Sequence, residues 1–262
     1  MTTVCEVHHL GLVPYQQAWD LQNALAAEIA AGRRLECLLL LEHPHTFTFG
    51  RRGHLENLLW DEAELVRRGV TVHWVDRGGD VTYHGPGQLV GYPLLNLGLA
   101  GLTRDPASGS PRLPQADYVG YVRRLEETLI LALARLGVSA HTVEGMTGVW
   151  VNRQWRAGSE QWMVKSDDSR ISPLESPAPA KIAAIGVKVD ARGITRHGFA
   201  LNVNPDMEYW QGIIGCGLVG YPVTSLGELL GNPPPMSLVI QEVVSAFAQV
   251  FGYDMVEAPD MA

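Results

Sequence analysis

Cys216 has the surroundings best suited to nucleophilic chemistry in this chain of 262 residues. It lies between two glycines in Ile213–Leu218 (IIGCGL), where neighbouring side chains cannot shield the sulfur and backbone N–H groups can point towards it. Such N–H groups stabilise a thiolate and can also hold the oxyanion of a tetrahedral acyl intermediate. A small buried hydrophobe in a tight turn is the alternative interpretation, and it is the usual one for a lone cysteine.

A cysteine nucleophile needs a base or a cation beside it, and the sequence offers both histidines and a lysine. The histidine candidates are His84, His141 and His197. Lys181 opens the apolar run KIAAIG and has no acidic neighbour in sequence. An amine held against apolar surface can act as base and as acid. A lysine at a strand end that extends its amine into water is an equally good interpretation.

The stretch Arg77–Gln88 (RGGDVTYHGPGQ) has the composition of a binding loop. Its four glycines, one proline and several polar side chains lie between two apolar runs, Thr71–Val75 and Leu89–Leu95, that we predict to be short strands. Glycine lets the backbone approach a ligand closely, and Gly-Pro-Gly makes a stiff turn. The stretch lacks the lysine of a phosphate-binding P-loop, so a nucleotide is not indicated. An ordinary hairpin connection remains the alternative.

Composition and charge exclude several classes of protein. The net charge is −8 and the basic residues are scattered, which disfavours extended contact with nucleic acid. No apolar run reaches the roughly 18 residues of a membrane span, and Met1–His9 does not resemble a signal peptide, so we expect a cytoplasmic protein without a membrane segment.

Metal chemistry is also disfavoured by the sequence. Three cysteines without a C-x-x-C pair argue against a disulfide framework and against a cysteine-based zinc site. His43 and His45 flank a proline and have no third ligand nearby, which favours a turn over a metal site. Cys37, inside an apolar run, is predicted to be an inert core thiol.

The elements that must position these residues are strands interleaved with helices. With 46% hydrophobic residues and no repeats or clear linker, we expect one domain over residues 1–262, with Asn152–Ala180 as a flexible insertion. The predicted strands are Leu35–Leu41, Thr46–Phe49, Thr71–Val75, Leu89–Leu95, Gly148–Val151, Lys181–Val189 and, as the hairpin partner of the last, His197–Val203. The predicted helices run from Pro14 to Gly32, Asp61 to Arg68, Asp117 to Gly137, Ser225 onwards through Glu228, and Ser237 to Gly252. Residues Gly98–Pro114 are predicted to form a long surface excursion.

Three runs together resemble one protein family. They are RGGDVTYHGPGQLVGYPL (Arg77–Leu94), KIAAIGVKV (Lys181–Val189) with HGFALNVN (His197–Asn204), and GCGL (Gly215–Leu218) followed by Thr224-Ser225-Leu226. The resemblance is to the lipoyl(octanoyl) transferases, and it covers roughly residues 38–230. It implies an α/β fold with a mixed sheet flanked by helices, like the catalytic domain of biotin and lipoate protein ligases. It also implies no cofactor and no metal.

The resemblance further implies a reaction and the residues that perform it. Octanoyl-acyl carrier protein is the implied donor, and the implied acceptors are lipoyl domains of 2-oxo acid dehydrogenase complexes and the glycine cleavage H protein. Cys216 is the implied acyl-thioester nucleophile and Lys181 its activator. The implied acyl-binding residues are Arg77, Gly78, Gly79, Asp80, Val81, Thr82, Tyr83, His84, Ala184, Ile185, Gly186, Gly198, Phe199 and Ala200, with His197 as a possible orienting residue.

The sequence departs from the family at two places. Proline usually precedes the nucleophile, whereas this chain has Gly215, and the insertion Asn152–Ala180 is longer than expected. Two other functions remain open at this stage. One is an ATP-dependent lipoate or biotin ligase of the same fold, in which Cys216 is dispensable. The other is a module without catalytic activity that docks lipoyl domains.

Overall fold

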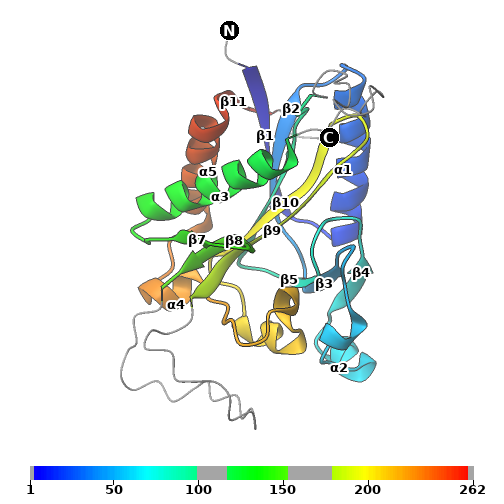
Figure 1. Ribbon diagram of the computed structural model, residues 1–262, viewed down its shortest axis with the longest axis vertical. Coiled ribbons are helices and arrows are strands. Elements are labelled where there is room, and N and C mark those ends of the chain that lie inside the picture. The colour runs from blue at the N-terminus through cyan, green and yellow to red at the C-terminus, as the bar shows by residue number, and fades with distance from the viewer. Residues whose placement is uncertain (1–2, 99–116, 153–178, 259–262) are drawn as a thin grey trace, which may run out of the picture.

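A computed structural model of the chain describes residues 3–98, 117–152 and 179–258, and its largest element is a mixed sheet of eight strands (Figure 1). The strands are hydrogen-bonded in the order β11-β1-β2-β6-β10-β9-β8-β7. Their bounds are Thr3–Leu12 (β1), Glu36–Glu42 (β2), Gln88–Leu94 (β6), His141–Val143 (β7), Met146–Val151 (β8), Ala180–Val189 (β9), Thr195–Asn202 (β10) and Tyr253–Glu257 (β11). Strand β1 is parallel to β2 and β11, whereas the pairs from β2 to β7 are antiparallel.

Helices cover both faces of this sheet, which explains the continuous apolar run in β2. Cys37, Leu39 and Leu41 face helix α1 (Tyr15–Ala30). Leu38 and Leu40 belong to the opposite core, which contains α3 (Tyr118–Arg135) and α5 (Met236–Phe251). In Figure 1, α1 lies on one side of the strands and α3 with α5 on the other. A strand that is buried on both faces needs apolar residues at every position rather than at alternate ones.

A second sheet of three strands carries part of the candidate loop. Its order is β4-β3-β5, with bounds Thr71–Trp74, Thr46–Phe49 and Val81–His84. The short helix α2 (Glu62–Arg67) precedes β4, and its N-cap Asp61 accepts a hydrogen bond from the N–H of Glu64 at 2.8 Å, as the sequence predicts. A smaller core around the side chains of Phe47, Phe49, Val81 and Tyr83 holds this sheet together.

The structure corrects the prediction that Arg77–Gln88 is one loop. Its middle is strand β5, which pairs antiparallel with β3. The flanking strands are not hairpin partners either, because β4 belongs to the small sheet and β6 to the large one. The predicted pairing of β9 with β10, in contrast, is confirmed.

Other differences lie at element ends and in strands that sequence reasoning missed. Ala180, predicted to end the insertion, is the first residue of β9, and α5 begins at Met236 rather than Ser237. Strands β1, β7 and β11 have no counterpart among the predicted elements. The predicted surface excursion and insertion fall largely on residues 99–116 and 153–178, outside the described residues. None of the helices in the described ranges is long and apolar enough to cross a membrane.

Candidate active site

The structure brings Lys181 and Cys216 into contact although they lie 35 residues apart in sequence. The amine of Lys181, on β9, donates a hydrogen bond to Cys216 Sγ with an Nζ–Sγ distance of 3.4 Å. Lys181 is buried, with 6% of its surface exposed, so its amine does not reach out into water as the alternative interpretation requires. A buried amine in contact with a thiol is an arrangement suited to proton transfer between them.

Backbone pairing on two sides holds the segment that carries Cys216. After the cysteine, the N–H of Lys181 donates to Pro222 O at 2.8 Å and the N–H of Thr224 donates to Lys181 O at 3.0 Å. Before the cysteine, the N–H of Ile214 donates to Asn57 O at 2.9 Å. The segment that carries Cys216 is therefore attached directly to the strand residue that carries the amine.

Cys216 itself has an uncommon backbone conformation. It lies in the one-turn 3-10 helix η3 (Gly215–Gly217) with φ 57° and ψ 15°, in the left-handed region. Cys216 and His197 are the described residues other than glycine with positive φ. Such conformations cost stability in a residue with a side chain and are often found at functional sites. The conformation places the Cys216 sulfur at the pocket described next.

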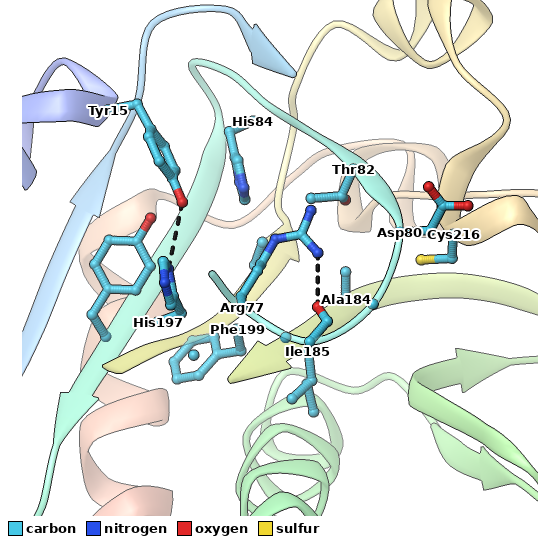
Figure 2. Close-up of a pocket in the computed structure, with 16 residues that line it drawn as sticks. Tyr15, Arg77, Asp80, Thr82, His84, Ala184, Ile185, His197, Phe199 and Cys216 are labelled. Carbon is cyan, nitrogen blue, oxygen red and sulfur yellow. Dashed lines mark hydrogen bonds between the residues drawn. The ribbon is translucent and has the colours of Figure 1, made fainter. Parts of the chain in front are cut away.

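The pocket is lined by most of the residues that the family resemblance implies (Figure 2). Figure 2 shows Cys216 beside Asp80 on one side, Tyr15, His84 and His197 on the other, and Arg77 between them. The implied binding residues that line it are Arg77, Gly78, Gly79, Asp80, Thr82, His84, Ala184, Ile185, Gly186, Gly198, Phe199 and Ala200, and His197 lines it as well.

Two of the implied binding residues do not line the pocket. Two other residues, which the sequence does not single out, do line it. Val81 and Tyr83 alternate with Thr82 and His84 along β5, so their side chains point to the other face and pack into the smaller core. Tyr15, at the start of α1, and Tyr92, on β6, complete the lining. Tyr15 lies outside the runs that resemble the family, and Tyr92 lies inside the run Arg77–Leu94 but has no feature of its own that predicts a place in the pocket. The alternation in β5 follows from strand periodicity.

Arg77 places a buried cation in the pocket wall. Its Nη2 donates to Thr48 O at 2.5 Å and to Thr48 Oγ1 at 2.9 Å, and its Nη1 donates to Gly78 O at 2.9 Å. Burial lowers the pKa of this guanidinium, but an arginine stays charged in proteins. None of the ion pairs between described residues involves Arg77, so its charge is available to a polar group of a ligand.

Glycines keep the floor of the pocket open. Gly186 of β9 pairs directly with Gly198 of β10. A Cβ atom added to Gly186 would lie 3.0 Å from Cδ of Arg77 and 3.1 Å from Gly78 O. The absent side chain at Gly186 lets the Arg77 loop lie against β9, and that at Gly198 lets the backbone of Gly91 approach β10.

The histidine candidates make contacts other than with the thiol. His197 Nε2 donates to Asp76 Oδ1 at 2.7 Å, and burial lowers the pKa of His197 although Asp76 opposes this effect. His84 Nδ1 donates to Gln88 Oε1 at 2.8 Å. His141 lies in β7, opposite Trp150. Within the described residues, the hydrogen-bonding partner of Cys216 Sγ is therefore the lysine and not a histidine.

The remaining cysteines and histidines do not form a second reactive centre. Cys5 and Cys37 are fully buried, and burial raises the pKa of the Cys37 thiol to about 12 and that of Cys5 further still. His43 donates from Nδ1 to Val13 O at 2.7 Å, and its Nε2 accepts from Tyr92 OH at 2.8 Å. In the parts of the chain that the structure describes, no group of three or more His, Cys, Asp or Glu side chains is arranged to hold a metal ion.

Comparison with known proteins shows which family the chain resembles. The family model of the lipoyl protein ligase A/B catalytic domain matches residues 14–248. An octanoyltransferase of Chloroflexus aggregans is 40% identical over 252 residues, which cover 96% of this chain and 97% of the relative. An octanoyltransferase of Syntrophotalea carbinolica is 42% identical over 242 residues, which cover 92% of each chain.

Solved structures show the same fold at low sequence identity. A bi-partite lipoate protein ligase from Thermoplasma acidophilum, studied with its E2 lipoyl domain, has a TM-score of 0.65 at 15% identity, covering 98% of this chain and 87% of that one. Lipoate-protein ligase A bound with ATP has a TM-score of 0.61 at 15% identity, covering 98% and 89%. The predicted mixed sheet flanked by helices, in the manner of the lipoate protein ligases, is thus confirmed. The chain belongs to the lipoyl protein ligase A/B catalytic domain family, together with these octanoyltransferases.

Proposed function

We propose that this protein transfers an octanoyl group from octanoyl-acyl carrier protein to the target lysine of lipoyl domains, through a thioester on Cys216. The observation that carries the proposal is the 3.4 Å contact between Lys181 Nζ and Cys216 Sγ, with the sulfur at the pocket. The octanoyltransferase names of relatives that align over nearly the whole chain support the acyl group and the reaction class.

In the first half of the reaction, Lys181 takes the proton of Cys216 and the thiolate attacks the carbonyl carbon of the donor thioester. The tetrahedral intermediate collapses with cleavage of the bond to the carrier's pantetheine sulfur. That leaving thiolate takes the proton from the Lys181 ammonium. The products are the S-octanoyl enzyme, a neutral Lys181 amine and the free carrier thiol.

In the second half, the amine of the acceptor lysine attacks the S-octanoyl carbonyl while Lys181 accepts its proton. Collapse expels the Cys216 thiolate and leaves an amide on the acceptor. The thiolate then takes the proton from the Lys181 ammonium, so the enzyme returns to its starting state. The donor thioester is already activated, and the proposed reaction therefore consumes no ATP. The acceptors we propose are lipoyl domains of 2-oxo acid dehydrogenase complexes and the glycine cleavage H protein.

The pocket is proposed to hold the octanoyl chain. Ile185, Phe199 and Ala200 contribute apolar surface, and the glycines let backbone line the slot. Burying about six methylene groups is worth roughly 5 kcal/mol, and one methylene more or less changes binding by only about 1 kcal/mol. Selection between neighbouring chain lengths is therefore expected to be modest. The buried Arg77 is proposed to attract the polar thioester carbonyl.

Mass spectrometry of the intact protein tests the proposal. We expect incubation with octanoyl-acyl carrier protein, without ATP, to add one octanoyl group that is absent in Cys216→Ser. Lys181→Met is expected to slow formation of the adduct while the fold is retained. Transfer to a lipoyl domain by Cys216→Ser, or transfer that depends on ATP, would contradict the proposal and favour a ligase. Binding of a lipoyl domain without transfer by the unmutated protein would favour a docking module.

A further inference from the structure

The amine of Lys181 lies between the Cys216 sulfur and the ring of Trp150. Trp150 is on β8 directly opposite Lys181 on β9, so both side chains lie on the same face of the sheet. Lys181 Nζ lies 4.6 Å from the centroid of the Trp150 ring. Trp150 is fully buried. An ammonium over the face of a desolvated tryptophan is stabilised by the ring's quadrupole, whereas a neutral amine gains little from it.

An irregularity in the sheet produces this contact. The register between β8 and β9 shifts by one residue between the pair Val149–Ala183 and the pair Trp150–Lys181. Such bulges re-aim side chains and are frequent beside active sites. Next to the irregularity, Gly148 has φ 120°, and a Cβ added there would lie 3.4 Å from Cε of Lys181. The stem of the lysine therefore packs against a bare backbone position.

A buried carboxylate holds the irregular part of β8 in place. The N–H of Gly148 donates to Glu126 Oε1 at 3.0 Å, and Arg123 Nη1 donates to Glu126 Oε2 at 2.6 Å. Glu126 lies on α3 and is 1% exposed.

The Trp150 ring also packs edge-on against the ring of Tyr221, with 5.7 Å between the ring centroids. Trp150 thus contacts both the strand of Lys181 and the segment that follows Cys216.

We infer that Trp150 is a positioning residue of the dyad: its ring face holds the Lys181 amine against Cys216 Sγ and favours the state in which the proton is on the nitrogen. The inference rests on the proposed function. In this state the S–H bond is broken and the N–H bond is formed, so the nucleophile is a thiolate before the donor arrives. The ammonium is then ready to protonate the leaving pantetheine thiolate.

Among the described residues, four other titratable or charged groups lie around the pair and the Trp150 ring. Arg77 and Asp80 line the pocket on the side of the sulfur, Tyr221 lies behind the Trp150 ring, and His141 of β7 is opposite Trp150 in the sheet. The indole N–H of Trp150 has no hydrogen-bonding partner among the described residues. Another aromatic ring can therefore replace the indole without the loss of a hydrogen bond. The Lys181 amine contacts the face of the ring.

Alkylation of Cys216 by iodoacetamide between pH 5 and pH 10 tests the inference without any octanoyl donor. Cys5 and Cys37 are buried, so mass spectrometry of the Cys216 peptide reports on the dyad. We expect Trp150→Leu to move the pH midpoint of alkylation upwards by about one unit and to slow alkylation at pH 7 about tenfold. Trp150→Phe, which keeps an aromatic face, is expected to stay within about threefold of the unmutated protein.

Phe247→Leu is the matched control, because Phe247 is a fully buried aromatic residue in α5 and lines no part of the pocket. It is expected to lower stability and leave the midpoint unchanged. An unchanged midpoint in Trp150→Leu, or an equal shift in Phe247→Leu, would overturn the inference. Either result would leave the proposed function unaffected, provided that Cys216→Ser still abolishes transfer.

Fluorinated tryptophans provide a second measurement that does not depend on the stability of Trp150→Leu. Fluorine weakens the negative potential on the ring face with little change in volume. We expect the midpoint to rise with the number of fluorine atoms in the unmutated protein and to stay constant in Trp150→Phe. The same rise in both proteins would show that other tryptophans cause it and would overturn the inference.

Discussion

Gly186 and Gly198 lie directly opposite each other in the β9–β10 pair, and a methyl group at either position would meet atoms closer than ordinary contact distance. The two overlaps differ in size. At Gly198 an added Cβ would lie 2.1 Å from Gly91 O, which is backbone of the neighbouring strand. At Gly186 it would lie 3.0 Å from Cδ of Arg77 and 3.1 Å from Gly78 O, so these neighbours would have to shift by only a few tenths of an ångström. The strand pair therefore tolerates the two substitutions differently.

Gly198→Ala is predicted to lower the free energy of unfolding by about 2–3 kcal/mol, because β6 and β10 must separate to accommodate the methyl group. Gly186→Ala is predicted to lower it by less than half as much, because Arg77 and Gly78 need to shift by less than β6 and β10 do. Urea denaturation measures both. Gly78→Ala is the control, since its added Cβ would lie 3.6 Å from Val187 O, an ordinary contact. Equal losses in Gly198→Ala and Gly78→Ala would contradict the prediction.

Removal of the Cys216 side chain is predicted to expose the cost of its left-handed backbone. Cys216→Gly is expected to be about 0.5–1 kcal/mol more stable than Cys216→Ala, since glycine adopts a φ of 57° without the strain that alanine experiences. Thermal unfolding of the two variants measures the difference. If Cys216→Ala is as stable as Cys216→Gly, the backbone strain assigned to Cys216 is wrong.

Gly215→Pro, which restores the residue usual in the family, is predicted to stabilise the protein by about 0.4–1 kcal/mol. Gly215 is the first residue of η3, and Ile214 before it is already extended, with φ −89° and ψ 92°. Proline is well tolerated at a first helical position after an extended residue. Alkylation of Cys216 is expected to be retained.

Gly217→Pro is the control for that substitution. Gly217 has φ 66°, and its N–H donates to Ile214 O at 3.0 Å, so proline fits neither the backbone angle nor the hydrogen bond. A lower melting temperature for Gly215→Pro than for the unmutated protein would show that Trp210, 3.1 Å from the added Cβ, cannot make room.

Acidification is predicted to destabilise the protein between about pH 6.5 and pH 4. Burial lowers the pKa of His43 to about 4, and it also lowers the pKa values of His84 and His197. As pH falls through this window, the unfolded chain binds protons at these histidines and the folded chain does not, so the unfolded state is favoured. Above about pH 6.5 the full stability is present.

Melting temperatures from pH 7.5 to pH 4.5 measure this effect. His43→Gln is expected to flatten the slope, since glutamine can replace both hydrogen bonds but does not titrate. His54→Gln, at an exposed position, is expected to leave the slope unchanged. A melting temperature that is constant over the whole range would contradict the prediction.

The sequence predicts best what depends on neighbours along the chain. A glutamate three positions later predicts the helix starts at Asp61 and Ser225, and the apolar spacing after Asp117 predicts the start there. Each of the three side chains accepts a backbone N–H from three residues on. The β9–β10 hairpin can be predicted equally well, because its two strands and the turn between them are consecutive in sequence. Local spacing contains the information for such elements.

The sequence predicts poorly what depends on pairing between distant segments. Strand β1 pairs with β11 at the other end of the chain, and β5 pairs with β3 across an intervening helix and strand. The contact between Lys181 and Cys216 also joins segments that are distant in sequence. Composition and the family resemblance single out the two residues, but no pattern in the sequence places them together. Tyr15 and Trp150 lie outside the runs that resemble the family, and Tyr92 lies inside one of them without a feature that marks it as a pocket residue.

The pairing of Val151 with Ala180 has a consequence for how this chain can vary in length. These residues end β8 and begin β9, so the chain leaves and re-enters the sheet at neighbouring points. The hydrogen bonds that join Lys181 to the segment that carries Cys216 all lie on the C-terminal side of that junction. Any connection between the two strands has to join only these neighbouring strand ends, and the loop-closure entropy of such a connection changes slowly with its length. The pairing of Val151 with Ala180 thus fixes where β9 begins, one residue before Lys181.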